Sequence, residues 1–218
     1  MTQVLTAAPA LLNAAWVSLT LFVLGSLIAL LLAFAAGLGR CSPRRWVRII
    51  ATVYAETFRG VSLVIQLFWL FFALPAFGIR LTETTAAVLG LGLCFGAYGS
   101  EIVRSSVIAV SQGQWEAAKA LGLSRTRTML LVIIPQAVLI MLPPFGNLFI
   151  QLLKSTSVAA LITVPELTFQ AQSINNNFGG GVGLFMLVLS MYFLMSRIVL
   201  SAIKAAERYY GRHIRATA

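Results

Sequence analysis

The stretch LTLFVLGSLIALLLAFAAG, residues 19–37, contains no charged residue. A bilayer core of about 30 Å needs about 20 predominantly apolar residues in a spanning helix. The stretch also lacks the strict alternation of apolar and polar residues that a strand of a membrane β-barrel would have. We therefore expect a transmembrane helix here, within a longer apolar block over residues 11–38.

Four further apolar blocks follow along the chain, at residues 61–79, 84–109, 129–152 and 182–203. The composition agrees with a membrane protein, because 59% of the 218 residues are hydrophobic and only 10% are charged. The blocks are too many and too long for buried core helices of a large soluble protein. We expect an all-α membrane protein with five transmembrane helices, forming a single domain over residues 1–218.

The basic residues indicate how the chain crosses the membrane. The net charge of +10 would suggest nucleic-acid binding if its placement were ignored. The charges gather in three places: Arg40, Arg44, Arg45 and Arg48; Arg104, Lys119, Arg125 and Arg127; and Lys204, Arg208, Arg212 and Arg215. These are alternate connections, so the positive-inside rule predicts an N-terminus outside and a C-terminus in the cytoplasm. No nucleic-acid partner is expected, and the missing basic segment before the first block argues against a cleaved signal peptide.

Carboxylates near the spans are expected to be paired, because unpaired charges at a membrane are costly. Glu56 and Arg59 stand three residues apart, which places them on one helix face. Glu101 has the same spacing to Arg104, and two readings stay open for it. It forms a salt bridge with Arg104, or it lines a polar pathway.

Two of the blocks contain residues that affect helix packing. Gly90, Gly92, Gly96 and Gly99 predict close approach of another helix to the block at 84–109. Pro135, Pro143 and Pro144 are expected to break and bend the block at 129–152. Such bends favour a cavity enclosed by protein, where freed backbone carbonyls find partners.

A polar run follows these prolines and is a candidate translocation surface. It comprises Asn147, Gln151, Lys154, Ser155, Thr156 and Ser157. The alternative is a helix end that emerges among the lipid headgroups, with the Lys154 ammonium reaching for water. Residues 158–181 are expected to form a short helix folded back on the bundle and an Asn/Gly-rich loop, with no chemistry of their own.

Several kinds of site are not expected. Cys41 and Cys94 are predicted to be free thiols, and neither suggests a metal site. Ser100 follows a glycine, as in some hydrolases, but the only histidine, His213, lies beyond the last block. The chain has no Gly-x-x-x-x-Gly-Lys-Ser/Thr element for ATP. We expect no cofactor and no catalysis.

The segment QGQWEAAKALGLSRTR, residues 112–127, separates the third and fourth blocks and is charged. Its alanines predict a short helix of little bulk, suited to lie in a groove of a partner. Glu116 is expected at the start of this helix, where it complements the helix dipole, and Gly122 is expected to end it.

In this segment Glu116, Ala117, Ala118 and Gly122 are followed by Val132, Ile134 and Pro135. The pattern resembles the EAA signature of permease subunits in bacterial ATP-binding-cassette (ABC) importers of type I, with Val132 and Ile134 in place of isoleucine and leucine. ETFRG (56–60), GAYGSEIVRSSV (96–107) and LLKSTSVAALI (152–162) are similar to blocks of the five-span polar amino-acid permeases. Val61-Ser62 departs from their Thr-Pro, and Ser105 or Ser106 from a common glycine. The run FWLFFALPAFGI resembles subunits for ectoine and hydroxyectoine.

The resemblance implies a multi-pass protein of the bacterial cytoplasmic membrane, surrounded by lipid. Glu116, Ala117, Ala118 and Gly122 would form a coupling helix in a cleft of a cytoplasmic ATPase dimer, which binds the ATP. A second permease chain, identical or homologous, and an external solute-binding protein would complete the importer. The competing hypothesis is a self-sufficient secondary carrier or channel, although such carriers commonly have internal repeats and none is evident here.

The small polar solute would be a polar amino acid or a related zwitterion such as ectoine. Its carboxylate needs donors and its cation needs acceptors or π-faces. Residues of two blocks are candidates for this path: Tyr98 and Glu101 toward the cation, and Lys154, Ser155, Thr156 and Ser157 toward the carboxylate.

Overall fold

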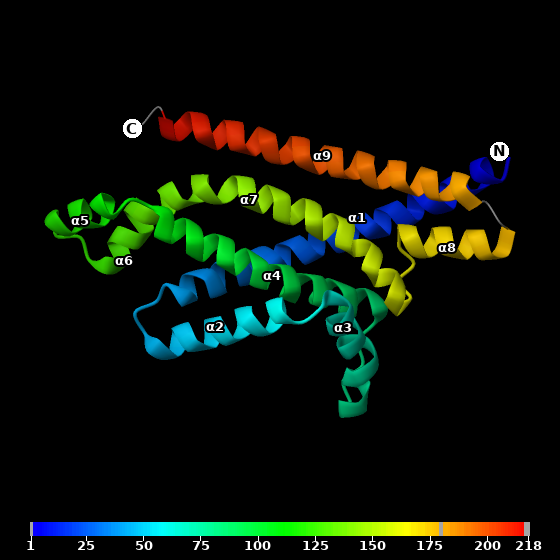
Figure 1. The fold of residues 1–218 in the computed structure, drawn as a ribbon, viewed down its shortest axis with the longest axis horizontal. Coiled ribbons are helices and arrows are strands. Elements are labelled where there is room, and N and C mark those ends of the chain that lie inside the picture. Colours follow the sequence, from blue (N-terminus) through cyan, green and yellow to red (C-terminus); the bar gives the residue numbers. More distant parts are fainter. Residues whose placement is uncertain (1, 179–180, 216–218) are drawn as a thin grey trace.

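A computed structural model describes residues 2–178 and 181–215, and every regular element within these ranges is a helix (Figure 1). The longer helices are α1 (Thr2–Arg40), α2 (Arg45–Gly60), α4 (Glu83–Ala109), α7 (Ile134–Ser155), α8 (Leu167–Phe178) and α9 (Gly181–Arg215). The shorter ones are α3 (Leu63–Phe68), η1 (Trp69–Ala73), η2 (Leu74–Phe77), α5 (Gln112–Ala120), α6 (Arg125–Thr128), η3 (Met129–Ile133) and η4 (Thr156–Ile162). The expectation of an all-α protein is confirmed.

Four helical segments are long and apolar enough to cross a membrane, and a bent pair provides a fifth candidate. The four are Pro9–Arg40, Glu83–Ala109, Arg125–Ile162 and Gly181–Ala205. The pair joins Arg45–Gly60 to Leu63–Phe77 at an angle of 103°. The block expected over residues 61–79 corresponds to α3, η1 and η2, which form the second half of this pair, and the chain turns through extended backbone at Val61 and Ser62 just before it. In Figure 1, α2 lies beside α4 while α3 projects away from the bundle.

The two ends of the bundle carry different segments. Figure 1 shows the start of α1 and α8 at one end, and α5, α6 and the last part of α9 at the other. This arrangement agrees with a chain that begins on one side of a membrane and ends on the opposite side. The direction of insertion stays a prediction from the arginine placement.

Helices α1 and α4 pack closely because α4 presents glycines to α1. A Cβ atom added to Gly92 would lie 2.5 Å from the Ile28 Cγ2 atom, and one added to Gly99 would lie 2.7 Å from the Ala33 Cβ atom. Gly37 of α1 faces the Val103 side chain in the same way, at 2.5 Å. The predicted close approach of a helix to these glycines is confirmed, as expected for helices that pack without help from water.

The prolines do not break the fourth span as expected. Helix α7 continues through Pro143 and Pro144, and Arg125–Ile162 counts as one unbroken helical segment. Pro135 stands in the first turn of α7, directly after the π-helical turn. The irregular part is the π-helical η3, which directly precedes α7.

A second apolar cluster joins α1, α8 and α9 at the opposite end from α5. It contains Leu11, Ala15, Leu153, Leu167, Ala171, Leu184, Val188 and Met195. Glu166 is completely buried beside this cluster, at the start of α8. Sequence analysis assigned no chemistry to residues 158–181, and Glu166 corrects that view.

Three hydrogen bonds hold the Glu166 carboxylate in place. Tyr192 of α9 donates its hydroxyl to Oε2 at 2.7 Å, and Ser18 of α1 donates to the same oxygen at 3.3 Å. The Phe169 backbone N–H donates to Oε1 at 2.8 Å, which caps α8. Ser18 also accepts the Leu167 N–H at 3.2 Å. One side chain thus ties α1, α8 and α9 together.

We predict a pH-dependent role for this carboxyl group. Burial raises the pKa of Glu166, and the hydrogen bonds from Thr168, Tyr192, Phe169 and Ser18 oppose the shift without cancelling it. A raised folded-state pKa gives stability that is complete below the ordinary value and is lost as the pH rises through the raised value. In thermal unfolding, the advantage of the wild type over Glu166→Gln should therefore shrink as the pH rises above the ordinary pKa of a glutamate. A difference that does not change with pH would contradict this.

Candidate functional site

Helix α5 is a short helix in the connection between α4 and α7, and it has a well-defined C-terminal end. The Leu123 N–H donates to the Ala118 carbonyl at 3.1 Å, and the Gly122 N–H donates to the Lys119 carbonyl at 3.0 Å. Gly122 has φ +72, in the left-handed region. These bonds make a Schellman motif, for which glycine is the favoured residue. The predicted stop at Gly122 is present in the structure.

One face of α5 packs on the bundle and the other is open. Ala118 is buried and Trp115 packs partly against the core, whereas Glu116 and Ala117 are exposed. Leu121, just after the helix, is 80% exposed. Glu116 was expected at the helix start, but α5 begins a turn earlier, at Gln112. The expected role of Glu116 in complementing the helix dipole is therefore not supported.

Glu101 of α4 is the centre of an ionic cluster at the same end of the bundle. Arg104 donates from Nη2 to Glu101 Oε1 at 2.6 Å and from Nε at 3.2 Å. Arg40, the last residue of α1, donates to Oε2 at 2.7 Å, and Arg59 of α2 donates to the same oxygen at 3.4 Å. The predicted Glu101–Arg104 salt bridge is present, and two arginines from other helices join it.

Glu56 completes this cluster at its exposed side. Its carboxylate lies 3.5 Å from Arg40 and 3.9 Å from Arg59. The expected Glu56–Arg59 pair is therefore the longer of two contacts. The Arg59 guanidinium also lies over the ring of Tyr98, 5.9 Å from its centre, within the range of a cation–π contact.

The candidate path residues of α7 form two groups. Asn147, Gln151 and Lys154 are exposed at helical spacing, so they share one open polar face that we call the α7 strip. Ser155 and Ser157 are partly buried, and the Ser157 hydroxyl donates to the Lys154 carbonyl. Thr156 is completely buried and donates to the Leu153 carbonyl at 2.8 Å.

The structure does not bring all predicted path residues into one pocket. Gly99 packs against Phe145 and Leu148, so Tyr98 and Glu101 are level with the middle of α7. Residues 154–157 begin about 9 Å further along the helix, at 1.5 Å per residue. Tyr98 is 43% exposed. A solute that contacts both Tyr98 and Glu101 and residues 154–157 would therefore contact these two groups one after the other.

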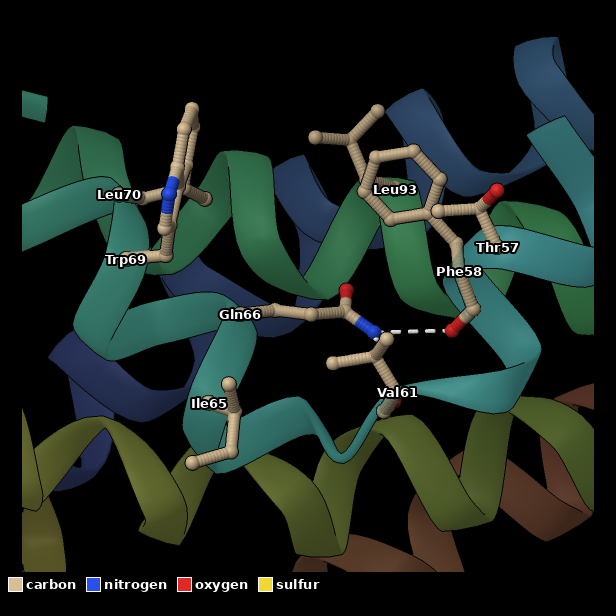
Figure 2. A pocket seen from close by; sticks show the side chains of 8 residues that line it. All are labelled: Thr57, Phe58, Val61, Ile65, Gln66, Trp69, Leu70 and Leu93. Carbon is tan, nitrogen blue, oxygen red and sulfur yellow. Dashed lines mark hydrogen bonds between the residues drawn. The ribbon is translucent and has the colours of Figure 1, made fainter. Parts of the chain in front are cut away.

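A cavity of about 400 Å³ lies at the bend between α2 and α3 (Figure 2). Its lining is mostly apolar and includes Phe58, Ile65, Trp69 and Leu93. Gln66 donates its amide to the carbonyls of Phe58 and Val61, at 2.8 and 2.9 Å. These are carbonyls that the end of α2 leaves free, so Gln66 stabilises the bend.

Sequence reasoning missed the roles of Gln66 and Glu166. A glutamine within an apolar block and a glutamate directly after Pro165 are the only signals that the sequence offers for them. Cys41 and Cys94 are free thiols, as expected. Among the described residues, no group of three or more His, Cys, Asp or Glu side chains could hold a metal ion.

Comparison with protein families matches residues 25–209 to the binding-protein-dependent transport system inner membrane component. The chain is 43% identical over 185 residues to a protein of Sinorhizobium fredii described as a probable amino-acid ABC transporter permease, covering 82% of this chain and 78% of that one. It is 39% identical to the L-cystine transport system permease TcyB of Bacillus subtilis, covering 76% and 71%. It is 36% identical to the glutamine transport system permease GlnP of Escherichia coli, covering 93% of each chain.

Solved structures give the same result. A crystal structure of an amino acid ABC transporter with histidines superposes with a TM-score of 0.88 at 31% identity, covering 94% of this chain and 96% of that one. An inward-facing MetNI methionine ABC transporter superposes with a TM-score of 0.81 at 15% identity, covering 94% and 98%, and shows the shared fold.

These relatives bear on activity, location and partners. Their permease subunits are non-catalytic, and ATP hydrolysis belongs to a separate subunit. The family implies an ATPase and a substrate-binding protein as partners. None of these matches specifies ectoine. With its apolar helices and this membership, the chain is a multi-pass protein of the inner membrane. It belongs to the family of binding-protein-dependent transport system inner membrane components, as an ABC importer permease of the polar amino-acid type.

Proposed function

We propose that this permease imports a polar, zwitterionic amino acid, with a second permease chain, a cytoplasmic ATPase dimer and an external binding protein. The observation that carries the proposal is the open face of α5, where Glu116 and Ala117 of the EAA pattern stand exposed on a helix with a defined end. ATP is bound by the partner subunit, and this chain needs no cofactor.

The coupling role follows from the shape of α5. Glu116 and Ala117 lie on its open face and would enter a cleft of the ATPase, while Ala118 holds the other face to the bundle. Small side chains let a helix sit deep in a groove, and the Glu116 charge sets its register there. Movement of the ATPase would then reach α4 and α7, the spans that flank α5.

A second permease chain is needed to enclose the solute path. Four or five spans from one chain leave the α7 strip open. Polar groups such as Asn147 and Gln151 are costly against lipid but suit a water-filled path between two chains. Tyr98 and Glu101 would meet the solute cation at one depth, and Lys154, Ser155, Thr156 and Ser157 would meet its carboxylate at another. Thr156 would have to turn from its buried position to take part.

The solute class rests on the chemistry of these groups and on the relatives. An ammonium and a carboxylate are both accommodated by this set. Relatives named for glutamine and L-cystine transport favour a polar amino acid. Ectoine is a second candidate on sequence resemblance alone, and uptake of labelled ectoine against labelled glutamine distinguishes the two.

We predict that Gly122→Val abolishes most ATP-driven uptake. A β-branched residue at φ +72 is strained, so α5 could not end and seat as it does. Nothing lies within 4 Å of a Cβ atom at Gly122, so the effect would be conformational. Gly183→Val is the matched control, since Gly183 of α9 is equally open but has no positive φ. The measurement is uptake into vesicles that contain the whole importer, with membrane content checked by blotting. Wild-type uptake by Gly122→Val would contradict the coupling role.

We also predict that Gln151→Leu and Ser155→Ala change the KM for uptake and leave ATP hydrolysis by the detergent-solubilised complex intact. These side chains would contact the solute, so their loss alters solute transfer without altering α5. Leu189→Met of α9, where Leu189 is 65% exposed, is the control for an outward-facing change. Unchanged uptake kinetics in both test variants would mean that neither Gln151 nor Ser155 contacts the solute.

A further inference from the structure

A cavity of about 320 Å³ lies between the coupling segment and the bundle. Arg40, Arg104 and Arg125 line it, together with Cys41, Val107, Ile108, Trp115 and Met129. The lining contains three guanidinium groups and no carboxylate. We call this cavity the arginine pocket.

The charge around the arginine pocket is not balanced. Glu101 and Glu56 pair with Arg40, Arg59 and Arg104, as described above. Arg125 has no carboxylate within 4.0 Å in the described part of the chain. Four arginines and two carboxylates leave a surplus of two positive charges. Burial raises the pKa of the Cys41 thiol despite the nearby Arg104, Arg40 and Arg125, so the thiol adds no negative charge.

The pocket lies at the boundary between membrane and water. Three candidate spans meet there: Pro9–Arg40 ends at Arg40, Glu83–Ala109 ends shortly after Arg104, and Arg125–Ile162 begins at Arg125. Lipid phosphates occupy this level of a bilayer. Trp115 and the apolar side chains of the lining suit the glycerol and acyl parts of a lipid, because indole rings favour the interface.

We propose that the arginine pocket binds the phosphate group of an anionic membrane lipid. Each arginine has five N–H donors, and those of Arg125 make no side-chain hydrogen bond within the described residues, so phosphate oxygens find donors from three helices. The bound phosphate connects Arg125 of α6 with α1 and α4, which braces the coupling segment against the bundle. The inference depends on where the spans end and does not rest on the proposed function.

The test measures lipid binding by the purified full chain in neutral detergent, as a shift in thermal unfolding. The probes are short-chain phosphatidylglycerol, phosphatidylcholine of the same chain length, and inorganic phosphate. Phosphatidylglycerol should stabilise the chain most, because the choline cation of phosphatidylcholine is repelled. Arg125→Gln should weaken phosphatidylglycerol binding about fivefold, the effect of losing one arginine near a headgroup.

Arg127→Gln is the matched control, since Arg127 belongs to the same short helix but does not line the pocket. Equal losses in both variants would overturn the proposal in favour of general surface charge. Equal stabilisation by phosphatidylcholine or by inorganic phosphate would overturn the anionic lipid as the ligand. If phosphatidylglycerol has no effect while Arg125→Gln weakens ATPase binding, the pocket belongs to an acidic side chain of the partner.

Discussion

The carboxylate of Glu101 is the contact on which one end of this permease depends. It accepts hydrogen bonds from Arg40 at the end of α1, Arg59 at the end of α2 and Arg104 on its own helix. Removing a partner from such a cluster is costly, because the remaining charges lose their compensation at the edge of a membrane. The cluster fixes α1, α2 and α4 next to the segment that leads into α5. A force that the ATPase exerts on α5 would therefore act on a connected group of helices.

The cluster can form only because α1 and α4 approach closely along their length. Gly92 and Gly99 leave no room for a Cβ atom against α1, and the resulting contact carries Arg40 to Glu101. At the opposite end, Glu166 ties α1 to α8 and α9 through Ser18 and Tyr192. Helix α1 thus has one polar attachment at Ser18, within the helix, and another at its last residue, Arg40.

Much of the fold was predictable because membrane-spanning helices are long and apolar. The glycines of α4 predicted its close packing, and Gly122 predicted the end of α5. The bend at Val61 and Ser62 was not predictable, since no proline or glycine follows Gly60 there, and the bend depends on the amide of Gln66 reaching two carbonyls. The expected break of the fourth span at its prolines is absent, because Pro143 and Pro144 fit inside a continuous helix.

The candidate site was predicted less completely than the fold. The EAA pattern identified α5, and the spacing of Glu101 and Arg104 identified one salt bridge. Contacts between residues far apart in sequence, such as Arg40 with Glu101 and Glu166 with Ser18, leave no local pattern. The burial of Thr156 likewise depends on its tertiary surroundings.

The central claim is that the Glu101 carboxylate joins α1 to α4. A double-mutant cycle with Arg40→Gln, Glu101→Gln and the double variant measures it directly, through the free energy of unfolding of the purified chain in detergent. The account predicts a coupling energy of about 1–3 kcal/mol, because the pair is 2.7 Å apart and the Arg40 side chain is only 9% exposed. Additive effects within about 0.5 kcal/mol would contradict it.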